Sequence, residues 1–117
     1  MDINMHSSEL RCLLANDCDF LLYGFVNQLS PHFEVIDTFE NGKAAVDGVK
    51  SRSRDFYNVV ILDISMPIMD GIEACRLIKS FYEEDAEARV PKIYALTSEE
   101  EPEMIAKIKQ AGFDEIF

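Results

Sequence analysis

Side chains that could handle phosphate or a metal ion stand at the ends of three apolar segments of the sequence. They are two carboxylates, an amide and two hydroxyls: Asp17, Asp63, Asn16, Thr97 and Ser98. A carboxylate pair with oxygen donors nearby favours a hard cation such as Mg²⁺, which needs only one or two carboxylates. A carboxylate can also attack phosphorus to form an acyl phosphate, while a hydroxyl such as that of Thr97 hydrogen-bonds the phosphoryl oxygens. These residue types fit a phosphatase, a phosphoacceptor or a simple metal-binding site.

Asp63 is the residue of this group that is hardest to explain as an ordinary turn residue. It directly follows the continuous apolar run 59–62, which is typical of a strand buried on both faces of a parallel sheet. A charge at the end of such a strand is costly unless it is hydrated, paired or bound to a metal. Asp17 and Thr97, taken singly, are also compatible with helix-cap or turn positions.

Five short apolar segments alternate with four stretches of helical periodicity. Strands are expected over residues 10–15, 33–39, 58–63, 90–96 and 113–117, and helices over 20–29, 43–50, 70–81 and 98–111. This alternation, with short loops, predicts an α/β fold in which helices cover both faces of a parallel sheet. Because the carboxyl ends of parallel strands lie at one edge, the polar residues described above are expected to converge there.

Local signals predict how several of these helices begin, end and face the core. Apolar residues of the first helix recur at steps of three and four, which predicts one inward face made of Leu21, Leu22, Phe25, Val26 and Leu29. Asp70 is expected to cap the third helix. Ser98 and Glu101 have the spacing of a capping box for the fourth helix, which Gly112 should end.

Composition narrows the class of protein. The chain has 117 residues, of which 48% are hydrophobic, and this suits one domain over 1–117 with residues 1–8 as an N-terminal extension. A formal net charge of -11 disfavours nucleic acid or an anionic membrane as a direct partner. The three cysteines lack the spacing of a zinc site or a disulfide framework, and no apolar stretch is long enough to span a membrane. A cytoplasmic protein with reduced, mostly buried thiols is expected.

The segment from Asp63 to Glu73, DISMPIMDGIE, resembles the DxxMPxMDGxE signature of receiver domains, the chemotaxis-regulator-like modules of two-component response regulators. The similarity covers nearly the whole chain. It includes the Asn16-Asp17 pair, Asn41-Gly42, Thr97 and the segment 111–114. The resemblance implies a flavodoxin-like, doubly wound parallel sheet of five strands in the order 2-1-3-4-5.

The resemblance also implies a role for each site residue. Asp63 would accept a phosphoryl group from a histidine of a partner kinase or histidine phosphotransfer protein. The Mg²⁺ ligands would be Asp17, Asp63 and the backbone carbonyl of Ser65, with Asn16 reaching the ion through water. Thr97 would contact the phosphoryl group and switch protein–protein contacts, while the side chains of Ser65 and Glu99 would flank the site.

Three positions depart from the family pattern. Asn16 replaces the first of two acidic residues, and Ile116 stands where a switching Tyr or Phe is usual. The family's invariant lysine is expected about two residues past Phe117, followed by proline and a fifth helix, and this chain contains none of them. We therefore expect a C-terminally incomplete receiver domain, a fragment of a longer protein, whose exposed apolar face would favour a homodimer.

Other classes explain the same residues less well. A haloacid-dehalogenase-type phosphatase has the pattern DxD, but Ser65 occupies the place of its second aspartate. A flavin carrier needs a phosphate-binding loop after the first strand, where residues 16–19 are too anionic. The serious alternative is a pseudo-receiver, an interaction module of the same fold that is no longer phosphorylated. Asn16 and the absent lysine favour it, whereas Asp17, Asp63 and Thr97 argue against it.

Overall fold

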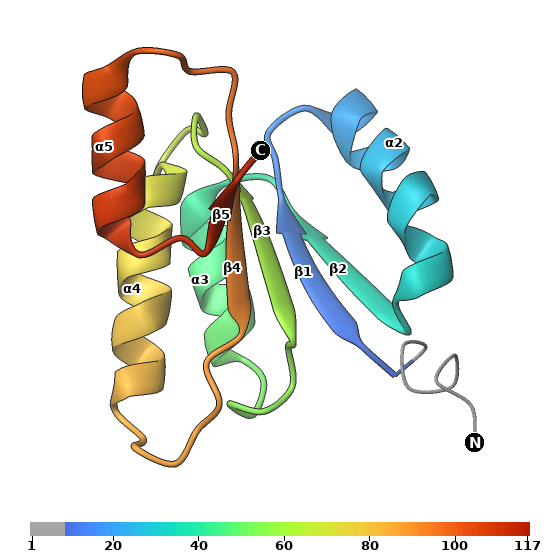
Figure 1. The fold of residues 1–117 in the computed structure, drawn as a ribbon. Coiled ribbons are helices and arrows are strands. Elements are labelled where there is room, and N and C mark those ends of the chain that lie inside the picture. Colours follow the sequence, from blue (N-terminus) through green and yellow to red (C-terminus); the bar gives the residue numbers. More distant parts are fainter. Residues whose placement is uncertain (1–8) are drawn as a thin grey trace.

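A five-stranded parallel sheet forms the centre of the protein, as a computed structural model of residues 9–117 describes it (Figure 1). The strands are β1 (Arg11–Ala15), β2 (Val35–Phe39), β3 (Val59–Asp63), β4 (Lys92–Leu96) and β5 (Glu115–Ile116). The helices are α2 (Asp19–Leu29), α3 (Gly42–Lys50), α4 (Gly71–Glu83) and α5 (Pro102–Ala111), with a 3₁₀ turn at Ser30–His32. The strand order β2-β1-β3-β4-β5 confirms the expected flavodoxin-like topology. The predicted extension 1–8 lies outside the described residues.

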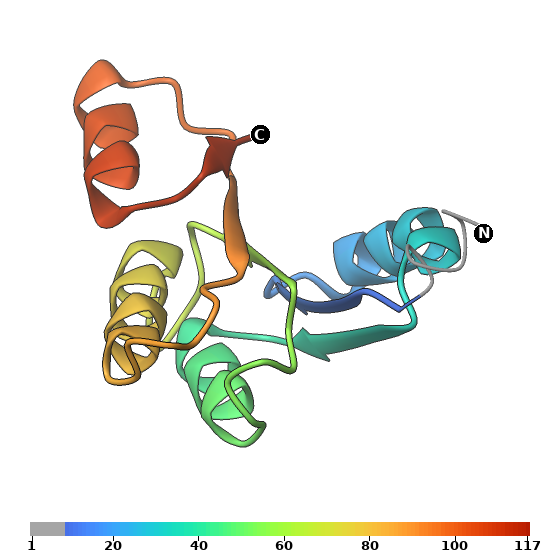
Figure 2. The ribbon, with the colours of Figure 1, turned by 60° about the horizontal axis from the view of Figure 1, so that its bottom comes forward.

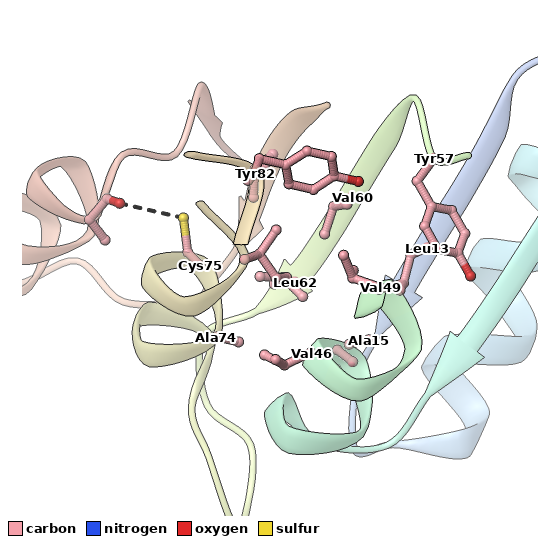
Figure 3. Close-up of a cluster of buried hydrophobic side chains, with 14 of the residues drawn as sticks. Leu13, Ala15, Val46, Val49, Tyr57, Val60, Leu62, Ala74, Cys75 and Tyr82 are labelled. Carbon is pink, nitrogen blue, oxygen red and sulfur yellow. Dashed lines mark hydrogen bonds between the residues drawn. The ribbon is translucent and has the colours of Figure 1, made fainter. Parts of the chain in front are cut away.

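Most of the core lies between the sheet and the helices α3 and α4. Side chains of alternate residues in β1 and β3 point to this face, among them Leu13, Ala15, Val60 and Leu62 (Figure 3). They meet a stripe of buried residues on α3 and α4: Ala45, Val46, Val49, Ala74, Cys75, Ile78 and Tyr82. A smaller cluster of Ile64, Ala95 and Ile108 lies beneath α5.

Helix α2 lies apart from α3, α4 and α5, on the other face of the sheet (Figure 2). The prediction that five apolar residues of this helix face the core was wrong in part. Leu22 is the buried residue of α2, whereas Phe25, Val26 and Leu29 are half-buried and Leu21 is exposed. An apolar stripe is buried fully only when neighbours cover its whole width, and no second helix of residues 9–117 lies beside α2 on this face (Figure 2).

Helix boundaries follow the predicted signals at Asp70 and Gly112 and depart from them at the predicted capping box, while the cap at Asn41 was not predicted. Side-chain oxygens of Asn41 and Asp70 accept hydrogen bonds from backbone N–H groups in the first turns of α3 and α4. Gly112 ends α5 in the left-handed conformation, at φ 102°. The capping box was wrong, because α5 begins at Pro102 after Glu101, which makes no side-chain cap hydrogen bond. The segment before it is extended instead.

Two of the three cysteines are buried, as the sequence predicted, and Cys18 is exposed. Burial raises the pKa of the Cys12 thiol to about 12 and that of Cys75 to about 11, so both stay protonated at neutral pH. Within residues 9–117 no helix is long and apolar enough to cross a membrane.

Replacing Asp70 by Ala is expected to destabilise the chain by about 1 kcal/mol, the usual effect of losing a helix cap. The Asp70 carboxylate accepts a hydrogen bond of 2.9 Å from the backbone N–H of Glu73, and alanine would leave that donor without its partner. Thermal unfolding followed by circular dichroism measures the effect. Glu83→Ala, at the exposed opposite end of α4, is the control and should leave the melting temperature nearly unchanged. Equal melting temperatures for the two variants would contradict the capping role.

Candidate functional site

The polar residues at the ends of β1, β3 and β4 meet in one pocket of about 540 Å³ at the carboxyl edge of the sheet. β3 lies between the other two strands, so residues from all three are neighbours in space. The pocket is lined by Asn16, Asp17, Asp63, Ser65, Thr97 and Ser98, together with apolar residues of α2, β4 and Phe117. An adjoining groove of about 360 Å³ adds Glu99 beside Asp63. The predicted convergence of the site residues is confirmed.

Asp63 ends β3, where it pairs in register with Leu96, and its side chain is half-buried. Burial raises the pKa of this carboxyl above its usual value. The negative charge of Asp17 raises it further, while the backbone amides of Ser65 and Ile64 act in the opposite direction. The carboxylates of Asp17 and Asp63 thus line the same pocket, where the charge of one acts on the other. A bound cation would relieve both the repulsion and the loss of solvation.

Asn16 is buried, with 3% of its surface exposed, and it is fixed from two sides. The side-chain oxygen of Asn16 accepts a hydrogen bond of 2.9 Å from the backbone N–H of Cys18. The backbone N–H of Asn16 donates to the carbonyl of Phe39. The Asn16 side chain therefore closes the turn that carries Asp17. The sequence indicated a polar turn here, but not that Asn16 itself makes it. Asparagine performs this function without adding a third carboxylate to the pocket.

The loop after β3 is held by close backbone approaches at two glycines. The N–H of Gly71 donates to the carbonyl of Ile64, and the N–H of Gly42 donates to that of Met69, both at 2.9 Å. A Cβ atom on either glycine would lie inside van der Waals contact of a backbone carbonyl oxygen. These contacts position Ser65 beside Asp63. The sequence did not indicate this contact of Gly42, because it joins segments far apart in the chain.

Thr97 connects the pocket to the last strand. Its hydroxyl oxygen accepts a hydrogen bond of 2.9 Å from the N–H of Glu99, and its backbone N–H donates to the carbonyl of Phe117. Ile116 points to the other face of the sheet and packs against the cluster beneath α5. Phe117 lies at the rim of the pocket, with its ring 5.7 Å from that of Tyr94. Ile116, which stands at the family's aromatic position, thus faces the opposite side of the sheet from its neighbour Phe117.

The donors in the pocket suit Mg²⁺ better than a softer metal. They are two carboxylates with carbonyl oxygens nearby, and no group of three or more His, Cys, Asp or Glu side chains gathers anywhere in residues 9–117. Zinc usually takes four protein ligands in structural sites and three in catalytic sites. Mg²⁺ keeps several waters and needs only one or two carboxylates. The residues present therefore fit a magnesium ion.

The fold and this acidic edge define a class: a doubly wound α/β protein with a carboxylate site at the carboxyl ends of its strands. The family model of the response regulator receiver domain matches residues 12–117. The chain belongs to this family and is a receiver domain.

Two relatives illustrate the range of proteins that contain such a domain. The chain is 39% identical over 102 residues to the chemotaxis protein CheY of Halobacterium salinarum, covering 87% of this chain and 78% of CheY. It is 29% identical over 114 residues to the peroxide stress-activated histidine kinase mak1 of Schizosaccharomyces pombe, covering 95% of this chain but 7% of mak1. The similarity to mak1 therefore concerns one small part of that kinase.

Solved structures agree with the fold. The CheX–CheY–BeF₃–Mg²⁺ complex of Borrelia burgdorferi aligns with a TM-score of 0.77 at 26% identity, over 92% of this chain and 76% of that one. The complex of the Saccharomyces cerevisiae histidine phosphotransfer protein Ypd1 with the Ssk1 receiver domain aligns with a TM-score of 0.81 at 20% identity. It covers 94% of this chain and 78% of that one. At this lower identity the second likeness supports the fold alone.

Proposed function

We propose that this receiver domain takes a phosphoryl group from a histidine of a partner protein onto Asp63. The observation that carries the proposal is the position of the Asp63 carboxylate. It is half-buried at the end of β3 and lines the same pocket as Asp17 and Thr97. A carboxylate in this position is accessible to a donor and close to groups that can bind the transferred oxygens.

The transfer would exchange one bond for another at phosphorus. A carboxylate oxygen of Asp63 attacks, the bond from phosphorus to the donor imidazole nitrogen breaks, and that nitrogen keeps the electron pair and takes up a proton. Mg²⁺, held by Asp17, Asp63 and the Ser65 carbonyl, with Asn16 contacting it through water, would supply charge neutralisation in this pocket. Its binding would also relieve the repulsion between the two carboxylates.

Thr97 and Glu99 would act on the product. The Thr97 hydroxyl accepts a hydrogen bond from the Glu99 amide, and its own proton is therefore available to donate to a phosphoryl oxygen. Movement of Thr97 would pull on Phe117, whose carbonyl its backbone N–H holds, and would disturb the packing of Ile116 beneath α5. Phosphorylation would thereby change protein–protein contacts on the surface of α5 and β5. Ser65 and Glu99, at the mouth of the groove, would tune the lifetime of the acyl phosphate.

The partner is expected to be a histidine kinase or a histidine phosphotransfer protein. The relative mak1 is a histidine kinase, and the Ssk1 receiver domain is solved in complex with the phosphotransfer protein Ypd1. The chain would then act as a phosphoacceptor in signalling rather than as an enzyme with a substrate of its own. Two buried, protonated thiols are consistent with a reducing cytoplasmic setting.

Incubation with acetyl phosphate and Mg²⁺, followed by intact mass measurement, tests the proposal. We expect a gain of one phosphoryl group, because a small donor needs only the acceptor and the ion. The gain should be absent in Asp63→Asn and in the presence of a chelator. Ser53→Ala, at an exposed turn outside the pocket, is the matched control and should label like the wild type.

Two outcomes would contradict the proposal. Wild-type chain that gains no phosphoryl group while binding Mg²⁺ would favour the pseudo-receiver, an interaction module that is not phosphorylated. Labelling that persists in Asp63→Asn would place the acceptor elsewhere.

A further inference from the structure

A second cavity, of about 220 Å³, lies at the amino edge of the sheet, where β1, β3 and β4 begin. This edge is at the bottom of Figure 1, opposite the acceptor pocket. No residue that lines this amino-edge cavity also lines the acceptor pocket, and the phosphoryl transfer proposed above uses none of them. The cavity is therefore available to a separate ligand.

Part of the lining of the amino-edge cavity is apolar and held in place. The apolar contribution comes from Leu10, Tyr57, Val90 and Pro91. Tyr57 is only 3% exposed, and its hydroxyl donates a hydrogen bond to the carboxylate of Asp37, which fixes the orientation of the ring. Pro91 is buried as well. A preformed apolar lining of this kind favours a ligand with a hydrocarbon body.

The charged groups of the amino-edge cavity are predominantly positive. Arg89 and Lys92 supply two positive charges, against the one negative charge of Asp55. Neither cation forms a salt bridge within residues 9–117. The Asp55 carboxylate already accepts a hydrogen bond of 2.7 Å from the hydroxyl of Ser53. The cavity thus has an excess of one positive charge in a chain whose formal net charge is -11, so it attracts an anion against the overall charge of the protein.

Asn58 adds a rigidly placed amide to these donors. Its side-chain oxygen accepts a hydrogen bond of 2.7 Å from the backbone N–H of Arg11, and its backbone N–H donates to the carbonyl of Arg11 at 2.8 Å. Its carbonyl accepts a hydrogen bond of 3.0 Å from the backbone N–H of Lys92. These bonds tie Asn58 to the starts of both neighbouring strands and leave its side-chain NH₂ as the group that can donate to a ligand. A guanidinium, an ammonium and an amide NH₂ together suit a carboxylate.

We infer that the amino-edge cavity binds a small organic carboxylate, whose hydrocarbon body lies against Tyr57 and Pro91 and whose charge is met by Arg89 and Lys92. Drug-sized ligands occupy pockets of about 300–1,000 Å³. A cavity of about 220 Å³ therefore suits a smaller molecule, such as a single ring that bears one carboxylate. Phosphate or sulfate would meet the cations but would leave the apolar lining without a contact. The inference does not depend on the proposed function, because the cavity and Asp63 lie at opposite edges of the sheet.

An NMR titration of the ¹⁵N-labelled chain with three probes tests the inference. Benzoate has a ring and a carboxylate, benzamide has the ring without the charge, and acetate has the charge without the ring. We expect benzoate to shift the backbone amide signals of Asn58 and Lys92 until they saturate, with a dissociation constant on the order of 1 mM. Benzamide and acetate should each bind roughly tenfold more weakly or worse, because each lacks one of the two kinds of contact.

Substitutions that remove one charge at a time identify the groups that hold the carboxylate. Arg89→Gln and Lys92→Gln should each weaken benzoate binding roughly tenfold, the effect of losing one charge-assisted hydrogen bond. Lys107→Gln, on α5 and outside the cavity, removes the same charge and is the matched control, which should bind benzoate like the wild type. All three side chains are exposed, so the variants should keep the fold, and thermal unfolding checks this. Asp63→Asn should also bind benzoate like the wild type.

Other results would overturn the inference. The signals of Asn58 and Lys92 could fail to shift or to saturate, or benzamide could bind as tightly as benzoate. A loss of affinity in Lys107→Gln as large as that in Lys92→Gln would reduce the effect to the overall charge of the chain. Benzoate-induced shifts at Asp17 and Asp63 in place of the amino edge would assign the anion to the acceptor pocket instead.

Discussion

An Asp63→Asn variant is expected to unfold at a higher temperature than the wild-type chain at neutral pH, while losing phosphoryl uptake. The Asp63 carboxyl is half-buried and feels the negative charge of Asp17, and both effects raise its pKa. Its charged form therefore destabilises the folded state. Asparagine keeps the shape of the side chain and removes the charge. The gain should be on the order of a few degrees in melting temperature.

The stability difference between variant and wild type should depend on pH in a defined direction. Because the folded-state pKa of Asp63 lies above its unfolded value of about 3.9, the native state binds more protons in the interval between the two values. Wild-type stability therefore falls as pH rises through that interval, and the Asn variant lacks this loss. The stability difference between variant and wild type should be small below this pH interval and should reach its full size above the folded-state pKa.

Urea unfolding of both chains between pH 3 and pH 7, roughly the range around this interval, measures the difference. The difference between the two chains is the quantity compared, because it cancels the contribution of carboxylates that lie far from Asp63. Mg²⁺ added at neutral pH should stabilise the wild type more than the variant, and the difference in unfolding free energy between the two chains should become smaller. A difference that shrinks with rising pH, or a less stable variant, would contradict the raised pKa that burial and the charge of Asp17 give Asp63.

Much of the fold could be predicted because its main elements carry strong local signals. The run 59–62 is apolar at every position and forms β3, in which Val60 and Leu62 are buried while Val59 and Ile61 are half-buried. The cap at Asp70 and the left-handed Gly112 depend on neighbours within a few residues, and both predictions were confirmed. The convergence of the site followed from topology alone, since parallel strands end at a common edge.

The errors concern features that depend on distant parts of the chain. Periodicity marked Leu21 as an inward residue of α2, but burial requires a neighbour on that face, and the helix alone does not specify one. Ser98 and Glu101 have the spacing of a capping box, yet Thr97 forms the local turn and Pro102 opens the helix. The left-handed backbone of Ile68, at φ 70°, had no signal in the sequence.

Gly71→Ala is expected to destabilise the chain by about 2–3 kcal/mol, an overpacking effect on backbone that cannot move aside. Gly71 is buried at the start of α4, and its Cβ would meet the carbonyl oxygen of Asp63 inside van der Waals contact and the Cα of Ile64 at 3.0 Å. The loop that positions Asp63 must shift to relieve this steric overlap. Acetyl phosphate labelling should therefore slow together with the loss of stability.

Gly24→Ala provides the matched control, because its Cβ would meet nothing within 4 Å. An alanine in the exposed interior of α2 should stabilise the chain by about 0.5–1 kcal/mol. Thermal and urea unfolding of the two variants compare the same chemical change at a crowded and an open position. Should Gly71→Ala match the wild type in both stability and labelling rate, the loop would have room to move, and a rigid coupling between α4 and the acceptor carboxylate would be excluded.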